Sequence, residues 1–509
     1  MTIERAILRF LDDLQGLDMH GFLLTLHGQT LCEGYWKPFS SDAPHRMYSV
    51  SKSCVSLAIG LLVGDGKLSL DERIVDRFPE WSAGASDELL EVTVRDMLMM
   101  ATCYDGTQYR VLEDENWTRP FFFGQPTHPA GTLFHYDTSS SQTLGALVER
   151  IAGCDILSFL QERLFTPLGM TGEKRWLKDA SGASQGGTGL LMTLGDLSKL
   201  ANFCMSDGLG LIPTGYLREA TACQIATGER PEPEARYGYG YQFWRMRRGF
   251  WLYGMGGQMA LCLPDSGVCL CTIADLTLDG PGVQPVVDAF FRHLEHIGEL
   301  AHDESDARAL RERLETLRCE PLTLAATRSA AAAPCESDTA RRDPRAPHAC
   351  QGDRPSGDAP VRIALTHGRL PFDALTLAKD AVIFSIGGKE YPLPFASGQW
   401  KDGIFPATAE KCMTSGGWRT PDRFELLCKL NGDFALTMRL FVAFKDTRAS
   451  VRVVSSLNEV AAGWDGLASG AEAEHATDET AAASGGKQAV EIRAKQRGGA
   501  REIARSQQG

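Results

Sequence analysis

The chain has 509 residues and a formal net charge of −13, with 43% hydrophobic and 23% charged residues. A chain of this length usually forms two or three domains, and this composition is typical of a soluble globular protein. The negative charge argues against nucleic acid or an anionic membrane as a partner, because both are bound by basic patches. No apolar run is long enough to cross a membrane. We therefore expect no nucleic-acid and no membrane partner.

The first predicted element is an amphipathic helix at residues 3–15. Acidic residues stand inside its apolar stretch, which distinguishes it from a signal peptide. Residues 21–36 follow as two strands around a His27-Gly28 turn. The 14 cysteines include no Cys-x-x-Cys pair, so we expect mostly reduced core thiols and no structural zinc. These features predict a cytoplasmic protein.

The next predicted element is a helix that begins near Ser49 and runs to about Val63, where Gly64-Asp-Gly66 ends it. Ser49 and Lys52 are three residues apart and so lie on one face of this helix. A serine needs an adjacent base to act as a nucleophile, and a lysine serves as that base where its surroundings lower its pKa. The N–H groups at the start of a helix can hold developing negative charge. Ser49 and Lys52 are therefore a candidate nucleophile and base.

The same pair has a second interpretation, in which Ser49 caps the helix and Lys52 lies on the surface. A second Ser-x-x-Lys sequence, Ser484-Gly-Gly-Lys487, stands in an Ala/Gly/Ser-rich stretch with no apolar helix after it. This second match shows that the pattern also arises by chance, and we do not expect it to be catalytic.

Beyond Lys67 the pattern is mainly helical to about Leu200, and strands return after it. The better helix candidates are residues 92–100, 141–152, 156–164 and 193–206. Strands are predicted at 238–244, 250–253, 259–263 and 268–274, with a helix at 284–297. Strands at both ends with helices between them favour one sheet assembled from both ends of the domain, an α+β arrangement. The helical region would face this sheet across a cleft, where functional sites tend to lie.

Four regions are predicted along the whole chain. Residues 1–300 form the domain just described. Residues 301–360 form a charged helix, at about 301–318, and a disordered linker from about residue 325. Residues 361–455 form a small all-β domain, with strand patterns at 381–386, 424–429 and 434–444. Residues 456–509 have too little apolar content to fold alone and form a disordered tail.

Two further stretches carry groups that an acyl-transfer site needs. Tyr136 stands in a loop before a helix that ends near Gly153. The glycine-rich stretch 253–258, Tyr-Gly-Met-Gly-Gly-Gln, would let a substrate approach the backbone closely. The alternative for Tyr136 is a packed aromatic ring with a satisfied hydroxyl.

A competing nucleophile stands at Ser184, because Gly182-Ala-Ser184-Gln-Gly186 matches the Gly-x-Ser-x-Gly elbow of α/β-hydrolases. That elbow needs a buried strand before the serine and a helix directly after it. The preceding residues 178–182 are mostly polar and do not form the pattern of a buried strand. We therefore interpret this stretch as a loop.

The order Ser-x-x-Lys, Tyr-x-polar, glycine-rich strand resembles that of the class C β-lactamase-like serine hydrolases. This family includes penicillin-binding-protein-type esterases, D-amino-acid amidases and aminohexanoate-oligomer hydrolases. The resemblance covers about residues 20–295, and the stretches most similar to family signatures are 48–53, 66–71, 144–149, 167–170 and 187–193. It implies a β-lactamase/transpeptidase-like fold, in which an antiparallel sheet flanked by helices is joined by a helical region.

Carried over residue by residue, the resemblance implies that Ser49 is the acylated nucleophile and Lys52 its base. Tyr136 would then relay a proton to the leaving group. The backbone N–H groups of Ser49 and Met255 would form the oxyanion hole, because the glycine of the third family motif falls on Gly254.

The chain departs from the lactamase form of the pattern at two positions. In the Tyr-x-Asn motif, Thr138 replaces the asparagine, and Thr138 is a candidate substrate contact. In the third motif, Leu252 replaces the cationic residue. Without that cation, the site lacks an obvious partner for the carboxylate of a penicillin. The ending at Gln258 is more similar to the esterase and aminohexanoate-hydrolase branch. Gln258 is a second candidate substrate-binding residue, and we expect it to fix the strand rather than to react.

The sequence therefore predicts a cytoplasmic serine hydrolase that needs neither cofactor nor metal and cleaves a small ester or amide through an acyl-enzyme. A catalytically inactive binding or scaffold protein on the same fold is one alternative, and a true β-lactamase is another. The natural substrate, the oligomeric state and the role of the β domain are left open.

Overall fold

The computed structural model describes residues 1–112, 114–278, 282–326, 360–430, 432, 436–456 and 464–473. The chain divides into two compact units, Met1–Cys319 and Glu320–Gly509. The first combines an antiparallel sheet and its flanking helices with a helical region, and the second is all β. The predicted α+β class with a C-terminal all-β domain is therefore confirmed. None of the described helices is long and apolar enough to cross a membrane.

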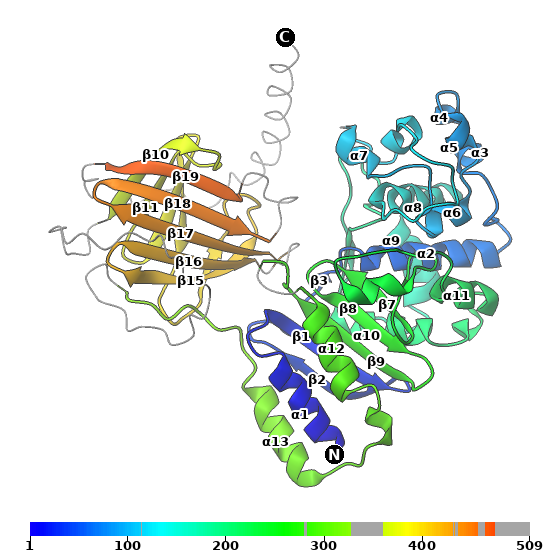
Figure 1. Ribbon diagram of the computed structural model, residues 1–509, viewed down its shortest axis with the longest axis horizontal. Coiled ribbons are helices and arrows are strands. Elements are labelled where there is room, and N and C mark those ends of the chain that lie inside the picture. The colour runs from blue at the N-terminus through cyan, green and yellow to red at the C-terminus, as the bar shows by residue number, and fades with distance from the viewer. Residues whose placement is uncertain are drawn as a thin grey trace. The chain divides into compact units, whose positions relative to one another are not determined.

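The first unit is organised around a six-stranded antiparallel sheet with the order β2-β1-β9-β8-β7-β6 (Figure 1). Its strands are β1 (Met19–Leu26), β2 (Gln29–Tyr35), β6 (Trp244–Arg245), β7 (Phe250–Gly254), β8 (Gln258–Leu263) and β9 (Val268–Ala274). The early strand β1 pairs with the late strand β9, with Leu23 opposite Cys271, so both ends of the unit build one sheet as predicted. The β1–β2 turn has positive φ at both His27 (49°) and Gly28 (78°), as the commonest two-residue hairpins require.

Helices α1 (Ile3–Asp13) and α12 (Gln284–His293) lie side by side over one face of the sheet, with α13 (Glu304–Glu315) beside α1 (Figure 1). Apolar residues of α1 and α12, including Phe10 and Phe290, form one core with residues of β1, β8 and β9. The charged stretch predicted at 301–318 is thus a helix of this unit.

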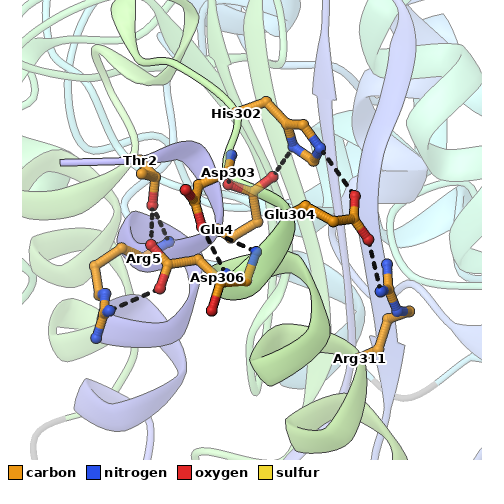
Figure 2. Close-up of polar contacts among 9 residues, drawn as sticks. Thr2, Glu4, Arg5, His302, Asp303, Glu304, Asp306 and Arg311 are labelled. Carbon is orange, nitrogen blue, oxygen red and sulfur yellow. Dashed lines mark hydrogen bonds and ion pairs between the residues drawn. The ribbon is translucent and has the colours of Figure 1, made fainter.

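Polar side chains join the start of α13 to the start of α1 (Figure 2). The Thr2 hydroxyl donates to Asp306 at 2.8 Å, and the Arg5 guanidinium pairs with Asp306 at 2.7 Å. His302 pairs with the buried carboxylate of Glu4, and this pairing raises the pKa of His302. These contacts fix α13 against the N-terminal helix.

The helical region is centred on α2 (Val50–Gly64), which is buried on every side from Val50 to Leu62. The other α-helices of the region are α3 (Ile74–Arg77), α4 (Pro79–Ser82), α5 (Asp87–Leu90), α6 (Val94–Leu98), α7 (Gln108–Val111), α8 (Thr138–Ala152), α9 (Ile156–Leu160) and α11 (Thr214–Thr221). The helix α10 (Leu194–Cys204) packs against β1, β8 and β9 of the sheet. Short 3-10 or π turns are η1 (Arg119–Phe123), η2 (Gln161–Phe165), η3 (Gly208–Gly210), η4 (Pro233–Tyr237) and η5 (Ile297–Glu299). The four helices predicted between residues 92 and 206 correspond to α6, α8, α9 and α10.

The serines of α2 are compatible with complete burial because each has a hydrogen-bond partner. The hydroxyl of Ser51 donates to the Tyr48 carbonyl at 2.6 Å, and that of Ser53 donates to the Gln242 carbonyl at 2.7 Å. The hydroxyl of Ser56 lies 2.9 Å from that of Tyr216. The polar residues of the helix therefore tie it to the turn before it and to two distant segments.

A small sheet with the order β3-β5-β4 holds the segment that precedes α2. Its strands are β3 (His45–Arg46), β4 (Arg175–Trp176) and β5 (Leu190–Met192). Arg46 lies opposite Leu191, and the N–H of Met47 donates to the Leu190 carbonyl at 2.8 Å. The chain therefore enters α2 from a fixed position.

The strand predicted at 238–244 is wrong for all but its last residue, where β6 begins. Gly238 has φ 107° and Gln242 has φ 65°, and neither value fits a regular strand. A Cβ on Gly240 would lie 2.1 Å from the Ala220 carbonyl oxygen. The alternation of glycine and aromatic residues mimics a strand, whereas tertiary contacts bend this segment against neighbouring helices.

The second unit is one ten-stranded antiparallel sheet with the order β13-β12-β11-β10-β19-β18-β17-β16-β15-β14. Its strands are β10 (Val361–Gly368), β11 (Ala374–Leu377), β12 (Ala381–Ile386), β13 (Lys389–Pro394), β14 (Lys401–Ile404), β15 (Lys411–Thr420), β16 (Arg423–Leu430), β17 (Thr437–Lys445), β18 (Arg448–Ser455) and β19 (Gly466–Ala473). The end strands β13 and β14 also lie in contact, which gives the sheet a barrel-like form. Trp464 packs with Phe372, Phe384 and Phe405 in its core.

The strand β19 lies within the stretch predicted as a disordered tail, and here the structure differs from the prediction. The segment has few apolar residues and gives no strand pattern, but it pairs on both sides, with Ala468 opposite Val451 and Ala471 opposite Ala364. Backbone pairing therefore orders it where its side chains give little signal. The predicted linker from residue 327 to 359 and the predicted tail at 457–463 and 474–509 lie outside the described residues, as do residues 434 and 435 of a predicted strand.

Candidate active site

Tyr48, two residues before α2, adopts a conformation that bulky side chains rarely take. Tyr48 has φ 46°, in the left-handed region, and Ser49 then begins the helix with φ −69° and ψ −7°. Such a residue costs about 1–3 kcal/mol and persists only where its surroundings hold it. The Ser51 hydroxyl does so here, since it donates to the Tyr48 carbonyl and accepts the Leu190 N–H at 3.0 Å. The bend fixes where the Ser49 side chain emerges.

The Ser49 hydroxyl does not cap its helix. It makes no capping hydrogen bond and instead accepts one from the Nζ of Lys52 at 3.1 Å. Lys52 is only 1% exposed, and its Nζ also donates to the Gly187 carbonyl at 2.7 Å. The interpretation of this pair as a helix cap with a surface lysine is therefore wrong.

Tyr136 lies near the same pair. Its ring centroid is 5.1 Å from the Lys52 Nζ, and the Ser49 hydroxyl acts on its phenol. Burial raises the pKa of Tyr136 to about 12, against smaller lowering effects from the Ser49 hydroxyl and the charge of Arg230. The phenol is therefore protonated at neutral pH and has a proton to donate.

Asp137 explains how Tyr136 is held. The Asp137 carboxylate caps α8 by accepting the N–H groups of Ser139 at 2.7 Å and Ser140 at 3.0 Å. Its burial raises the pKa of Asp137. The cap anchors the loop at the residue next to Tyr136.

The glycine-rich turn after β7 lies against the segment before Ser49. A Cβ on Gly254 would lie 2.2 Å from the Met47 carbonyl oxygen, so only glycine fits there. The turn continues through Met255 to two glycines with positive φ. The Gln258 amide nitrogen donates to the Met255 carbonyl at 2.7 Å and to the Ala274 carbonyl at 3.0 Å, and its oxygen accepts the Ala274 N–H at 3.1 Å. These bonds make Gln258 a brace for the turn.

Thr138 and Gly187 pack against each other beside Lys52. A Cβ on Gly187 would lie 2.5 Å from the Cγ2 of Thr138 and 3.3 Å from the Nζ of Lys52. A side chain at position 187 would therefore press on both. Leu252, in contrast, is fully buried among the apolar residues of the core around α2, so the position that carries a cation in the lactamase motif is apolar in this chain.

The competing serines do not form a comparable arrangement. Ser184 lies in a buried loop between β4 and β5, and neither a strand directly before it nor a helix directly after it is present among these described residues. The Gly-x-Ser-x-Gly elbow is therefore absent at Ser184. Ser484 and Lys487 lie outside the described residues.

The structure brings together Ser49, Lys52, Tyr136 and Thr138, and it adds three residues that sequence reasoning missed. These are Gly187, whose carbonyl accepts from Lys52, Trp244, whose ring stacks on Tyr136 at 5.3 Å, and Arg230, whose charge acts on Tyr136. Gly187 stands in a stretch similar to a family signature, but its local sequence does not indicate that its carbonyl accepts a hydrogen bond from Lys52. Within the described residues, no group of three or more His, Cys, Asp or Glu side chains is placed to hold a metal ion.

The fold is that of the β-lactamase family, and comparison with known proteins agrees. The family model described as "Beta-lactamase" matches residues 19–279, just over half of the chain. The chain therefore belongs to the β-lactamase family, and the predicted β-lactamase/transpeptidase-like fold is confirmed.

Three proteins of known name or structure are similar to this chain. A 6-aminohexanoate-dimer hydrolase of Paenarthrobacter ureafaciens is 23% identical over 210 residues, which are 38% of this chain and 53% of the relative. The chain thus spans about half the length of that relative. A solved structure from Bacillus anthracis, provisionally described as a 6-aminohexanoate-dimer hydrolase, has a TM-score of 0.50 and 18% identity over 58% of this chain and 83% of its own. The D-amino acid amidase of Ochrobactrum anthropi has a TM-score of 0.47 and 19% identity over 58% and 99% of the two chains.

Proposed function

We propose that the protein is a serine hydrolase that cleaves an ester or an amide through an acyl-enzyme on Ser49. The observation that carries this proposal is the hydrogen bond of 3.1 Å between the buried Lys52 Nζ and a Ser49 hydroxyl that caps nothing. A hydroxyl with a base within hydrogen-bond reach is the arrangement that nucleophilic catalysis needs.

In the proposed reaction, unprotonated Lys52 accepts the Ser49 proton while the Ser49 oxygen attacks the substrate carbonyl carbon. The N–H groups of Ser49 and Met255 hold the oxyanion of the tetrahedral intermediate. The intermediate collapses when the carbon–leaving-group bond breaks, and Tyr136 gives its proton to the leaving group. Tyr136 is reprotonated from Lys52. A water molecule then attacks the acyl-enzyme by the same route in reverse and releases the acid and free Ser49.

The neutral state of the Tyr136 phenol supports its role as a donor in this scheme. A tyrosine with a pKa of about 12 cannot act as a standing phenolate base at neutral pH. Thr138 and Met255 are proposed substrate contacts, whereas Gln258 is proposed to act on the substrate only through the turn that it braces.

For the substrate, we propose small amides and esters rather than penicillins. The relative from Paenarthrobacter ureafaciens is named as a hydrolase of an amide dimer, which supports an amide substrate. The buried Leu252 leaves the lactamase position without a cation, which weighs against the β-lactamase alternative. The contacts among Ser49, Lys52 and Tyr136 weigh against the binding-only alternative.

Turnover of a short-chain nitrophenyl ester tests the proposal. We expect hydrolysis by the wild type and by Ser484→Ala, which removes the serine of the second Ser-x-x-Lys sequence. Ser49→Ala should be inactive. Equal activity of Ser49→Ala and wild type would overturn the proposal, and a wild type inactive on esters, amides and β-lactams would favour a binding protein.

We also propose a cytoplasmic location. The described cysteines are all free, even where the sulfur atoms of Cys269 and Cys271 lie 3.8 Å apart in the core, as expected in a reducing compartment. Fractionation of the source cells tests this. Recovery of the protein outside the cytoplasm would contradict it.

A further inference from the structure

A positively charged group lies near the candidate site on a segment unrelated to the family motifs. Arg230 stands in the loop between α11 and η4, and its guanidinium carbon lies 5.5 Å from the ring centroid of Phe134 and 5.7 Å from that of Trp244. Trp244 stacks in turn on Tyr136. One aromatic cluster thus connects the guanidinium of Arg230 to the ring of Tyr136.

The charge of Arg230 reaches the reacting groups. It lowers the pKa of Tyr136, as a cation facing the phenol must, although burial of Tyr136 outweighs this effect. A negative group held at Arg230 would therefore lie close to Tyr136 and to whatever Tyr136 protonates.

The guanidinium has unused hydrogen-bonding capacity. Within the described part of the chain, neither a hydrogen bond nor an ion pair reaches it, and its Nε is buried without a partner. An unsatisfied buried donor costs stability unless a ligand or water completes it. The loop itself is held, because Arg236 donates to the Arg230 carbonyl at 2.8 Å.

The nearby carboxylates of the described chain either form ion pairs with other arginines or form no ion pair with Arg230. Glu229 pairs with Arg236 at 3.0 Å, and the buried Glu234 pairs with Arg247 at 2.6 Å. Glu232 acts on Tyr253, whose pKa it raises after the larger effect of burial, and it forms no ion pair with Arg230. The loop thus presents one unneutralised guanidinium at the aromatic cluster.

We propose that Arg230 binds a carboxylate on the leaving group of the substrate. A guanidinium matches a carboxylate with two parallel hydrogen bonds. The partly exposed ring of Phe134, which packs on the buried Trp244, offers an apolar surface for the part of the substrate between that carboxylate and the scissile bond. The leaving-group side is chosen because Trp244 contacts both the guanidinium of Arg230 and the ring of Tyr136, the proposed proton donor to that group. This inference rests on the proposed function and names the substrate class: open-chain esters and amides whose leaving alcohol or amine carries a carboxylate.

Matched substrates test it. We would compare kcat/KM for 4-acetoxybenzoate, which has a carboxylate on the leaving group, with that for its uncharged methyl ester. The wild type should prefer the charged compound, and Arg230→Ala should lose about tenfold or more on that compound alone, since a charged bidentate contact is removed. Arg230→Lys should retain part of the preference. Arg218→Gln, which removes an exposed charge from α11, is the matched control and should leave the ratio unchanged.

A second pair, the mono-4-nitrophenyl ester of adipic acid and its methyl ester, moves the carboxylate to the acyl side. Dependence on Arg230 in this pair alone would overturn the leaving-group assignment. For each pair, the relevant ratio is kcat/KM of the charged compound divided by kcat/KM of its methyl ester. If this ratio is the same in Arg230→Ala and the wild type for both pairs, the proposal is overturned and the proposed function stands.

Binding provides a readout that does not need turnover. The product 4-hydroxybenzoate should bind Ser49→Ala at least about tenfold more tightly than Ser49→Ala/Arg230→Ala by calorimetry. Equal affinities would contradict a carboxylate site at Arg230. If Arg230-dependent binding is present while the wild type hydrolyses nothing, the proposed function fails and the binding site remains.

Discussion

The Nζ of Lys52 lies 3.1 Å from the Oγ of Ser49, although Lys52 is 1% exposed and stands within a helix buried on all sides. A buried lysine is costly unless its hydrogen bonds are satisfied, and here the Gly187 carbonyl accepts a second one at 2.7 Å. The helix thus holds the buried ammonium or amine group of Lys52 within hydrogen-bond reach of the Ser49 hydroxyl.

Replacement of Lys52 tests this relationship. Lys52→Ala should lower kcat by about a thousandfold or more, because the Ser49 proton then has no acceptor, with a smaller change in KM. Steady-state kinetics on a nitrophenyl ester measures both. Lys174→Ala removes another buried lysine, whose Nζ lies 2.6 Å from a carboxylate oxygen of Asp196. This variant controls for general destabilisation. Activity of Lys52→Ala close to that of the wild type would exclude Lys52 as the base.

The role of Tyr136 predicts a dependence on the leaving group. Tyr136→Phe should reduce kcat on an unactivated amide by about a hundredfold or more, because an amine must be protonated as it departs. It should have a much smaller effect on a nitrophenyl ester, whose phenolate leaves without a proton. Parallel kinetics on the two substrates decide the matter, and equal losses on both would show that Tyr136 acts before the leaving-group step.

The raised pKa of Tyr136 adds a prediction for alkaline pH. A donor with a pKa of about 12 keeps its proton below that value, so its ionisation should not reduce kcat on an amide up to about pH 10. We expect any alkaline decline in that range to persist in Tyr136→Phe. A decline that the substitution abolishes would mean that Tyr136 titrates near its ordinary value.

The close contact between Gly254 and the Met47 carbonyl predicts that no side chain larger than hydrogen is tolerated at position 254. Gly254→Ala places a Cβ 2.2 Å from the Met47 carbonyl oxygen, so the turn that carries Met255, a proposed oxyanion-hole residue, must move. We expect a loss of about 1–3 kcal/mol in the free energy of unfolding, together with reduced kcat. Urea denaturation and ester kinetics measure the two effects. Gly195→Ala is the matched control, because nothing lies within 4 Å of its added Cβ in α10, and it should be neutral or stabilising.

The buried pair His20 and His45 predicts how stability depends on acidity. The His20 Nδ1 lies 2.9 Å from the His45 Nε2, and burial lowers the pKa of His45 to about 3, with the charge of His20 as a smaller cause. The unfolded chain binds a proton at His45 below its ordinary pKa of about 6.5, whereas the native state does not until about pH 3. The contribution of His45 to stability is therefore complete above about pH 6.5 and is lost as the pH falls, by about 2 kcal/mol at pH 5.

Urea denaturation of the wild type and of His45→Gln at pH 7.5 and pH 5 measures this effect. The substituted protein should lose less stability between the two pH values than the wild type does. An equal loss in both proteins would show that other groups account for the acid sensitivity.

The local part of the site was predictable from the sequence. Ser49 and Lys52 are three residues apart on a helix whose apolar pattern is strong, so spacing alone sets them on one face. Tyr136 and Gly254 were found through the order of motifs along the chain. These predictions depend on short segments whose conformation follows from their own residues.

Contacts between distant segments were not predictable. Lys52 and the carbonyl of Gly187 are 135 residues apart, and a backbone carbonyl leaves no signature in a sequence. Arg230 lies in a polar loop similar to many surface loops, and only the folded chain shows its guanidinium beside Phe134 and Trp244. The bend at 238–243 was missed for the same reason, because tertiary packing overrides the local pattern.

Covalent labelling tests the central claim most directly. The wild-type protein would be treated with an active-site phosphonate probe, digested, and mapped by mass spectrometry. Our account predicts one modified residue, Ser49, with labelling retained in Ser484→Ala and lost in Ser49→Ala. An unlabelled wild type, or a Ser49→Ala variant labelled as fully as the wild type, would contradict the assignment of Ser49 as the nucleophile.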